Sequence, residues 1–165
     1  MTQHTTAAAP ESLASRLAEL AGLIERSDPG TRAALRRADP RTEHGWRSGA
    51  FYRLTAGLDP QPWQEPAWAV LLAGMACIEH VPKGPPFGAL LAEHAVSELR
   101  LARLLGADRQ QLPTQVRSLV HLLQSKGVTR CDWYQPAQLV LFDSEAARRQ
   151  IARAFYRTHH QKTTH

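Results

Sequence analysis

Hydrophobic residues recur along most of this chain at the three- and four-residue spacing of an α-helix. The pattern is sharpest in residues 97–126, which contain two apolar stripes. Their members are Leu101, Leu104 and Leu105, then Val116, Leu119, Val120 and Leu123. Each stripe has the i, i+3, i+4 spacing of a buried helix face. Pro113, which suits the first turn of a helix, separates the two stripes. This stretch therefore predicts a helical hairpin whose core contains these side chains.

Helix start signals and further apolar stripes extend this interpretation to the rest of the chain. Ser12 and Ser144 can each cap a helix, Pro29 suits the first turn of another, and Pro66 can open a very apolar one. Residues 41–49 contain glycine and serine without any period, which indicates a loop. No alternating strand pattern is present. The sequence predicts an all-α fold, a compact bundle of about eight to nine helices.

The domain boundaries follow from where the apolar anchors begin and end. Residues 1–11 are small and polar, which favours a disordered N-terminal arm. Residues 12–157 are expected to form a single helical domain, since 165 residues suffice to bury a core without disulfides or metal. Residues 158–165 lack apolar anchors, and a disordered tail is expected there.

Positive charge is clustered rather than spread along the chain. The net charge is +5 with a pI near 9.8, and only Lys83, Lys126 and Lys162 among the 20 basic residues are lysine. An arginine preference alone also arises from a GC-rich genome. Its concentration in residues 31–60 and 97–130 is more informative, because the guanidinium fork pairs well with phosphate oxygens. The clustering favours contact with nucleic-acid backbone.

Two pairs illustrate how helical spacing groups these charges. Arg100 and Arg103 are three residues apart, and Arg117 and His121 are four apart, so each pair shares one side of its helix. Arg148, Arg149, Arg153 and Arg157 are expected on the surface of the final helix. The hairpin therefore acquires a basic rim.

Trp63 and Trp68 stand at the start of the most apolar helix. An indole in this place can pack on the core or stack on a base, and packing is the favoured interpretation for both.

The sequence contains no recognisable catalytic or metal-binding arrangement. Cys77 and His80 are a possible start of a metal site, but no second pair completes it, and Cys131 has no partner for a disulfide framework. Glycine-rich phosphate loops and nucleophile motifs are absent. No run approaches the ~20 apolar residues that span a bilayer. We expect a cytoplasmic protein without enzymatic activity, cofactor, metal or membrane contact.

Six motifs carry a family resemblance over about two-thirds of the chain. They are LRRADP (35–40), AFYRL (50–54), FGALLAEH (87–94), SELRLARLLGADR (97–109), VRSLVHLL (116–123) and CDW (131–133). In this order the chain resembles the CasB family, the small subunit of the type I-E CRISPR surveillance complex, Cascade. It departs from the family at Ala89 and Ser118, where arginine is common.

The resemblance implies a non-catalytic, two-lobed helical protein that assembles as a tandem dimer beside the large subunit and the repeated backbone subunits. Its basic residues would line the path of the target strand and help to hold the displaced strand of the R-loop, while the crRNA reads the sequence. Both single- and double-stranded nucleic acid are therefore expected partners. Carried over by motif, the nucleic-acid-binding residues are Arg37, Arg100 and Arg117, with Arg36, Arg53 and Arg103 as further candidates.

Two other functions remain open from the residues alone. One is a helical transcriptional regulator of the helix-turn-helix type, with residues 97–126 as the reading hairpin. The other is an assembly adaptor whose charges are only solvated.

Overall fold

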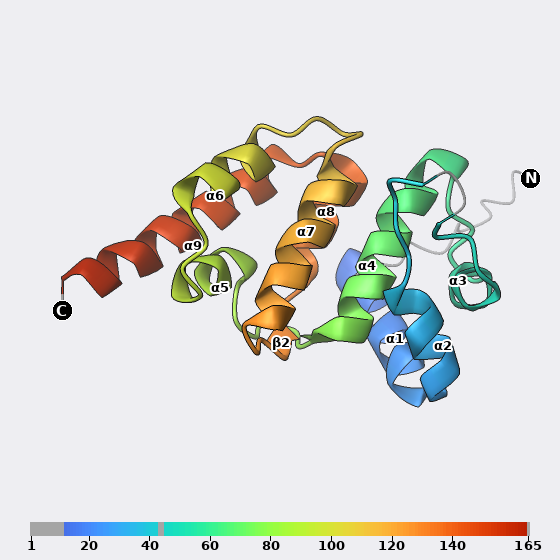
Figure 1. Ribbon diagram of the computed structural model, residues 1–165. Coiled ribbons are helices and arrows are strands. Elements are labelled where there is room, and N and C mark those ends of the chain that lie inside the picture. Colours follow the sequence, from blue (N-terminus) through green and yellow to red (C-terminus); the bar gives the residue numbers. More distant parts are fainter. Residues whose placement is uncertain (1–11, 43–44, 165) are drawn as a thin grey trace, which may run out of the picture.

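A computed structural model describes residues 12–42 and 45–164, which form nine α-helices, one 3-10 turn and two short strands (Figure 1). The helices are α1 (Leu13–Arg26), α2 (Pro29–Arg36), α3 (Gly49–Thr55), α4 (Glu65–Cys77), α5 (Phe87–Glu93), α6 (Glu98–Leu105), α7 (Leu112–Ser125), α8 (Tyr134–Phe142) and α9 (Glu145–Thr163). The turn is η1 (Pro62–Gln64), and the strands are β1 (Glu79–His80) and β2 (Arg130–Cys131). The all-α prediction is confirmed for the described residues; the expected arm, residues 1–11, lies outside them.

Polar residues before the helices fix where several of them begin. A side-chain oxygen of the capping residue accepts a hydrogen bond from an amide in the first turn, which satisfies a donor without a helical partner. The residues that do this are Ser12, Asp28, Ser48, Ser97 and Ser144. Before α7, Asp108 Oδ1 accepts from the Gln111 amide at 2.9 Å, and Pro113 lies in the first turn, as the sequence predicted.

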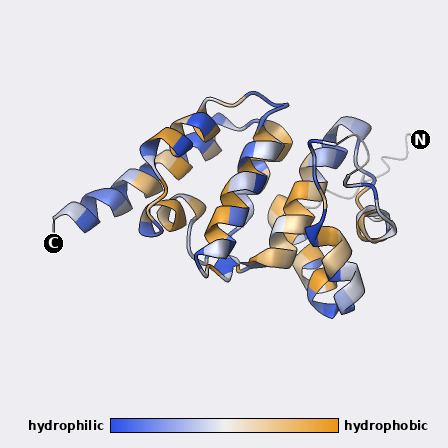
Figure 2. Cartoon of the chain, in the orientation of Figure 1, coloured by the Kyte–Doolittle hydropathy of each residue, from blue (hydrophilic) through white to orange (hydrophobic). Residues whose placement is uncertain are grey.

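Helix α4 is the centre of the molecule. Its residues Ala67–Ala76 are all buried, because α1, α2, α3, α7 and α8 all contact it. A helix that is buried on every side needs apolar residues on every side, and the face of α4 seen in Figure 2 is mostly hydrophobic. Trp133 packs directly on Gly74, where a Cβ atom would lie only 2.2 Å from the indole Cη2. The indole Nε1 donates to the Ile78 carbonyl at 2.9 Å. The tryptophan of the CDW motif is therefore a core residue.

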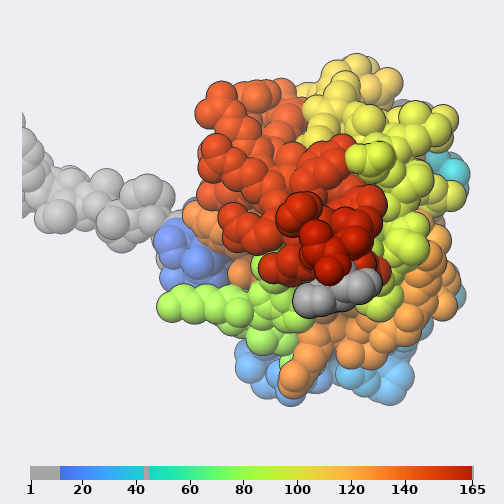
Figure 3. Space-filling view, turned by 90° about the vertical axis from the view of Figure 1, so that its left-hand side faces the viewer, coloured from blue at the N-terminus to red at the C-terminus, as the bar shows by residue number. Residues whose placement is uncertain are grey.

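Helices α5 and α9 pack closely together at the end of the molecule opposite to α1–α4, and α6 lies alongside them (Figure 1, Figure 3). Gly88 allows this close approach, because a Cβ there would lie 2.1 Å from the Ile151 carbonyl oxygen. Helices α7 and α8 lie between this end and the α1–α4 end. The molecule thus consists of two groups of helices joined through α7 and α8.

A short parallel pairing links the segment after α4 to the segment between α7 and α8. Glu79 pairs with Arg130 and His80 with Cys131. The sequence did not predict these strands, because two residues each are too few to show an alternating pattern.

Two details of the expected core and boundaries differ from the structure. Six of the seven stripe residues are buried, whereas Leu105 is only partly buried because α6 ends there. Helix α9 continues to Thr163, past residue 157, where we expected the helical domain to end. Lys162 explains the extension, since its Nζ donates to the carbonyls of Ala92 and Glu93 at 3.1 and 2.7 Å.

Candidate nucleic-acid interface

An open groove of about 490 Å³ between α6, α7 and the segment after α2 gathers several arginines. We call it the arginine groove. Its lining residues are Arg41, Arg100, Arg103, Thr114, Gln115, Arg117, Ser118, Leu119 and His121. None of the described residues that line it is acidic, and these residues present guanidinium, hydroxyl and amide groups to a ligand.

The apolar stripes aim these side chains into the groove. Leu101 and Leu104 are buried, which leaves Arg100 and Arg103 exposed on the other side of α6, one turn apart. On α7 the buried Val116 fixes the helix rotation in the same way. The helical periodicity therefore determines both the core and the part of the groove that α6 and α7 form.

Arg117 anchors the groove to a distant part of the chain. Its Nε donates to the Ala38 carbonyl at 3.1 Å, across 79 residues of chain, and holds α7 to the segment after α2. A guanidinium has five N–H donors, so the terminal nitrogens retain donors for a phosphate.

Arg41 enters the groove from the loop and is paired with Asp39. Its Nε lies 3.0 Å from Asp39 Oδ1 and its Nη2 2.9 Å from Oδ2. Hydrogen bonds from the Arg41 side chain and backbone, together with the charge of Arg117, hold the pKa of Asp39 far below its usual value. Asp39 is therefore ionised at neutral pH and offsets part of the positive charge of Arg41.

His121 adds little charge at neutral pH. Burial lowers its pKa, and the neighbouring charges of Arg117 and Arg41 lower it further against the opposing effect of Asp39. The positive potential of the groove therefore comes from arginine.

The structure brings three of the six predicted binding residues together in the groove, namely Arg100, Arg103 and Arg117. The other three do not line it. Arg36 donates from Nε to the Ala76 carbonyl at 3.0 Å and lines a separate cavity. Arg37 caps the C-terminus of α2, and Arg53 lies in the last turn of α3; both are exposed. Their contact with nucleic acid stays a prediction.

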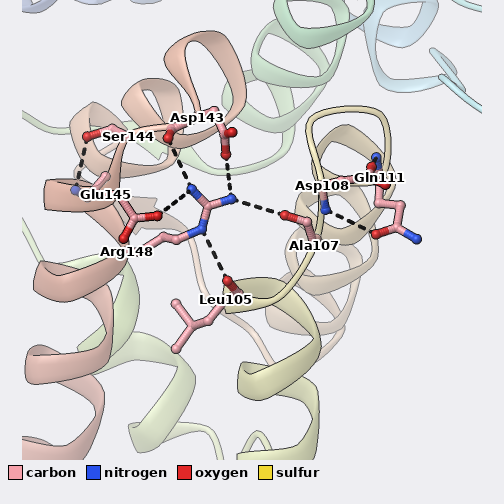
Figure 4. Close-up of polar contacts among 9 residues, drawn as sticks. Leu105, Ala107, Asp108, Gln111, Asp143, Ser144, Glu145 and Arg148 are labelled. Carbon is pink, nitrogen blue, oxygen red and sulfur yellow. Dashed lines mark hydrogen bonds and ion pairs between the residues drawn. The ribbon is translucent and has the colours of Figure 1, made fainter.

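Sequence reasoning missed two arginines. Arg41 lies in an irregular loop, where no periodicity assigns a direction to its side chain. Arg148 was expected on the surface, but its side chain is only 13% exposed and forms a clamp between α6, α8 and α9 (Figure 4).

We call the contacts of this residue the Arg148 clamp. The guanidinium donates to the carbonyls of Leu105, Ala107 and Asp143 at 3.0–3.1 Å. It also pairs with the carboxylates of Asp143 at 2.5 Å and Glu145 at 3.6 Å. The clamp therefore holds the C-terminal end of α6, and α6 is the helix that carries Arg100 and Arg103.

Other chemistry finds no support in the described chain. Within residues 12–42 and 45–164, no three His, Cys, Asp or Glu side chains gather where they could hold a metal ion. Burial raises the pKa of both Cys77 and Cys131, and the buried His80 Nδ1 accepts from the Trp133 amide at 3.0 Å. Nor is any helix in these ranges long and apolar enough to cross a bilayer.

The fold and the groove define a small all-α protein that presents arginines from two helices and a loop to one open surface. Residues 31–156 match the family model of CRISPR-associated protein Cse2, and the chain belongs to this family. The resemblance to CasB noted from the motifs is therefore confirmed.

Two solved structures are similar to the chain. One is a chain in the crystal structure of E. coli Cascade bound to a PAM-containing dsDNA target, with 25% identity over 86% of this chain and 95% of that chain and a TM-score of 0.67. The other is M. ruber CasB, with 22% identity over 91% of this chain and 97% of that chain and a TM-score of 0.69, a likeness of fold. No curated protein matches the sequence.

Proposed function

We propose that this protein is the non-catalytic small subunit of a type I-E Cascade complex, and that its arginine groove binds nucleic-acid phosphates and stabilises the R-loop. Family membership and the likeness to a chain of DNA-bound E. coli Cascade support the assignment to the complex. The observation that carries the binding role is the meeting of Arg100, Arg103 and Arg117 in one groove. In this proposal the large subunit, the backbone subunits and a second copy in a tandem dimer are its partners.

The energetics of R-loop formation suit such a groove. The RNA–DNA heteroduplex is about as stable as the DNA duplex that it replaces, so a few contacts between protein and backbone decide the balance. A charge-assisted hydrogen bond contributes ~1.5–3 kcal/mol at best and less where solvent screens it. Three such contacts suffice to shift a nearly balanced equilibrium.

The groove also suits binding without sequence preference. Arginines at its rim can pair with phosphates in any sequence context, and phosphate contacts position a strand without reading it. Sequence recognition is left to the guide RNA. The helix-turn-helix alternative has no comparable support from the family match.

The test is R-loop formation by a reconstituted complex on a matched duplex, measured by gel shift. The variant Arg100→Glu with Arg103→Glu reverses two exposed charges of the groove, and Arg149→Glu with Arg153→Glu makes the same change on the exposed surface of α9. We expect the groove variant to weaken target binding at least about 10-fold, and the α9 control much less. Equal effects in folded, incorporated variants would contradict the proposal.

A further inference from the structure

Trp63 is the only one of the four tryptophans that is exposed. Its side chain is 56% exposed, whereas Trp46, Trp68 and Trp133 are 6%, 3% and 0% exposed. Packing, the favoured interpretation for both tryptophans at the start of α4, therefore applies to Trp68 alone. An exposed indole on a folded surface offers a large flat apolar face to a ligand.

Trp63 lines a pocket of about 390 Å³ that is more enclosed and less polar than the arginine groove. We call it the Trp63 pocket. Its lining includes Pro40, Trp63, Pro66, Arg109, Gln110 and Pro113. The guanidinium carbon of Arg109 lies 5.1 Å from the centre of the indole ring. Both groups are flat, and both are surfaces on which nucleobases stack.

The pocket is adjacent to the arginine groove. Pro40 lines the pocket and the next residue, Arg41, lines the groove; on α7, Pro113 lines the pocket and Thr114 the groove. Two separate chain segments thus connect the sites at consecutive residues. A strand whose phosphates lie in the groove has its bases within reach of the pocket.

We propose that the Trp63 pocket receives an unpaired nucleobase of the single strand whose backbone lies in the arginine groove. This inference rests on the proposed function, and it adds that the ligand of the groove is single-stranded. A base in a duplex is stacked on both faces and cannot enter the pocket, so the site selects single-stranded over double-stranded nucleic acid. Stacking tolerates any base, because every base has an aromatic face.

The occupant follows from charge as well as shape. The pocket combines largely apolar walls with the cation of Arg109 over the Trp63 ring and the arginine groove beside it, an environment that favours an apolar ring attached to an anionic backbone. A base on its phosphate chain has both features.

The test compares two 20-nucleotide probes of equal charge, oligothymidylate and a chain of the same length with abasic sites in place of the thymidines. Fluorescence anisotropy gives the affinity of the full-length protein for each probe. Trp63→Ala should lower the affinity for oligothymidylate roughly 5- to 100-fold, the contribution of stacking one base, and leave the abasic probe unaffected. Trp63→Phe should retain most of the affinity.

Tyr52→Ala is the matched control, because Tyr52 is 49% exposed on α3 and lines neither the groove nor the Trp63 pocket. Intrinsic fluorescence gives a second measurement, since oligothymidylate should quench the exposed indole of the wild-type protein and the abasic probe should not. High salt should lower the affinity of the protein for both probes but preserve the ratio between the two affinities, because stacking is not ionic.

The outcomes separate the two proposals. Equal binding of both probes, with Trp63→Ala unchanged, would overturn the pocket and leave the groove. No binding of either probe by the wild-type protein would count against the proposed function and the pocket together. If Trp63→Ala binds both probes normally but no longer enters the reconstituted complex, the pocket is a contact between subunits and not a base site.

Discussion

The arginine groove and the Arg148 clamp use the same side chain for opposite purposes. In the clamp, three carbonyls and two carboxylates surround one guanidinium, whose side chain is 13% exposed. In the groove, Arg100 and Arg103 are exposed beside one another on α6. A guanidinium saturated by its own protein stabilises the fold, whereas one without such partners raises the local potential and can bind an anion.

Arg117 combines the two roles. Its Nε bond to Ala38 is structural, and its side chain also lines the groove. The two regions are also linked through α6, because the Arg148 clamp holds the end of the helix that carries Arg100 and Arg103. A count of the arginines in a sequence therefore overestimates how many can bind a ligand, because some, such as Arg148, are already bonded within the protein.

The largest expected effect is on stability, at the clamp. Arg148→Ala leaves three carbonyls and the Asp143 carboxylate without their partner, and we expect a loss of about 3 kcal/mol in the free energy of unfolding. Urea unfolding measures it. Arg149→Ala, the exposed neighbour, should change stability by no more than about 0.5 kcal/mol. If Arg148→Ala lowers the free energy of unfolding by less than about 1 kcal/mol, the clamp does not stabilise the fold as we propose.

Arg117→Ala should have an intermediate, mixed effect. Loss of the bond to Ala38 should cost about 1 kcal/mol of stability, and loss of one phosphate contact should weaken binding of single-stranded DNA about 5- to 10-fold. Urea unfolding and anisotropy measure the two effects. Arg103→Ala is the control, since it should weaken binding without lowering stability. Identical stability and binding profiles for the two variants would contradict the dual role of Arg117.

A gain of binding is expected at Ser118, which lines the groove between Arg117 and Leu119. Ser118→Arg adds one cation beside Arg117, and we expect about 3- to 10-fold tighter binding of DNA at moderate salt. Ser125→Arg, at the exposed end of the same helix and outside the groove, is the control. Equal gains from the two substitutions would mean that net charge alone determines the affinity.

The smallest effect concerns pH. The pKa of His121 is lowered, so the folded state binds this proton less readily than the unfolded state, and stability falls as the pH drops below about 6.5. A phosphate in the groove opposes the shift, so DNA binding should take up protons and strengthen about 2- to 3-fold between pH 8 and 6. His121→Ala should flatten this pH dependence of the affinity. If the pH dependence of the affinity is unchanged in His121→Ala, another titratable group causes it.

Most of the fold could be predicted from local signals. Capping residues such as Ser12 and Ser144, the proline at the start of α7 and the apolar stripes specify helices within a few residues of chain. The same periodicity placed Arg100 and Arg103 on one exposed side. These features are local, and a sequence displays them directly.

The rest depends on tertiary contacts that leave no periodic signal. Arg41 enters the groove from a loop, and Arg148 is partly buried because the ends of α6 and α8 meet its side chain. The final turns of α9 are held by Lys162 against α5, across 70 residues of chain. Spacing along one helix cannot distinguish such a side chain from a solvated neighbour.

The salt dependence of single-stranded DNA binding tests the central claim most directly. Each arginine that pairs with a phosphate contributes ~0.7 to the slope of log affinity against log salt concentration, so three contacts predict a slope of roughly 2 in magnitude. Arg100→Ala with Arg103→Ala should lower that magnitude by ~1.4. Arg149→Ala with Arg153→Ala should leave it unchanged. A slope that is the same in all three proteins would show that the arginine groove does not bind the strand.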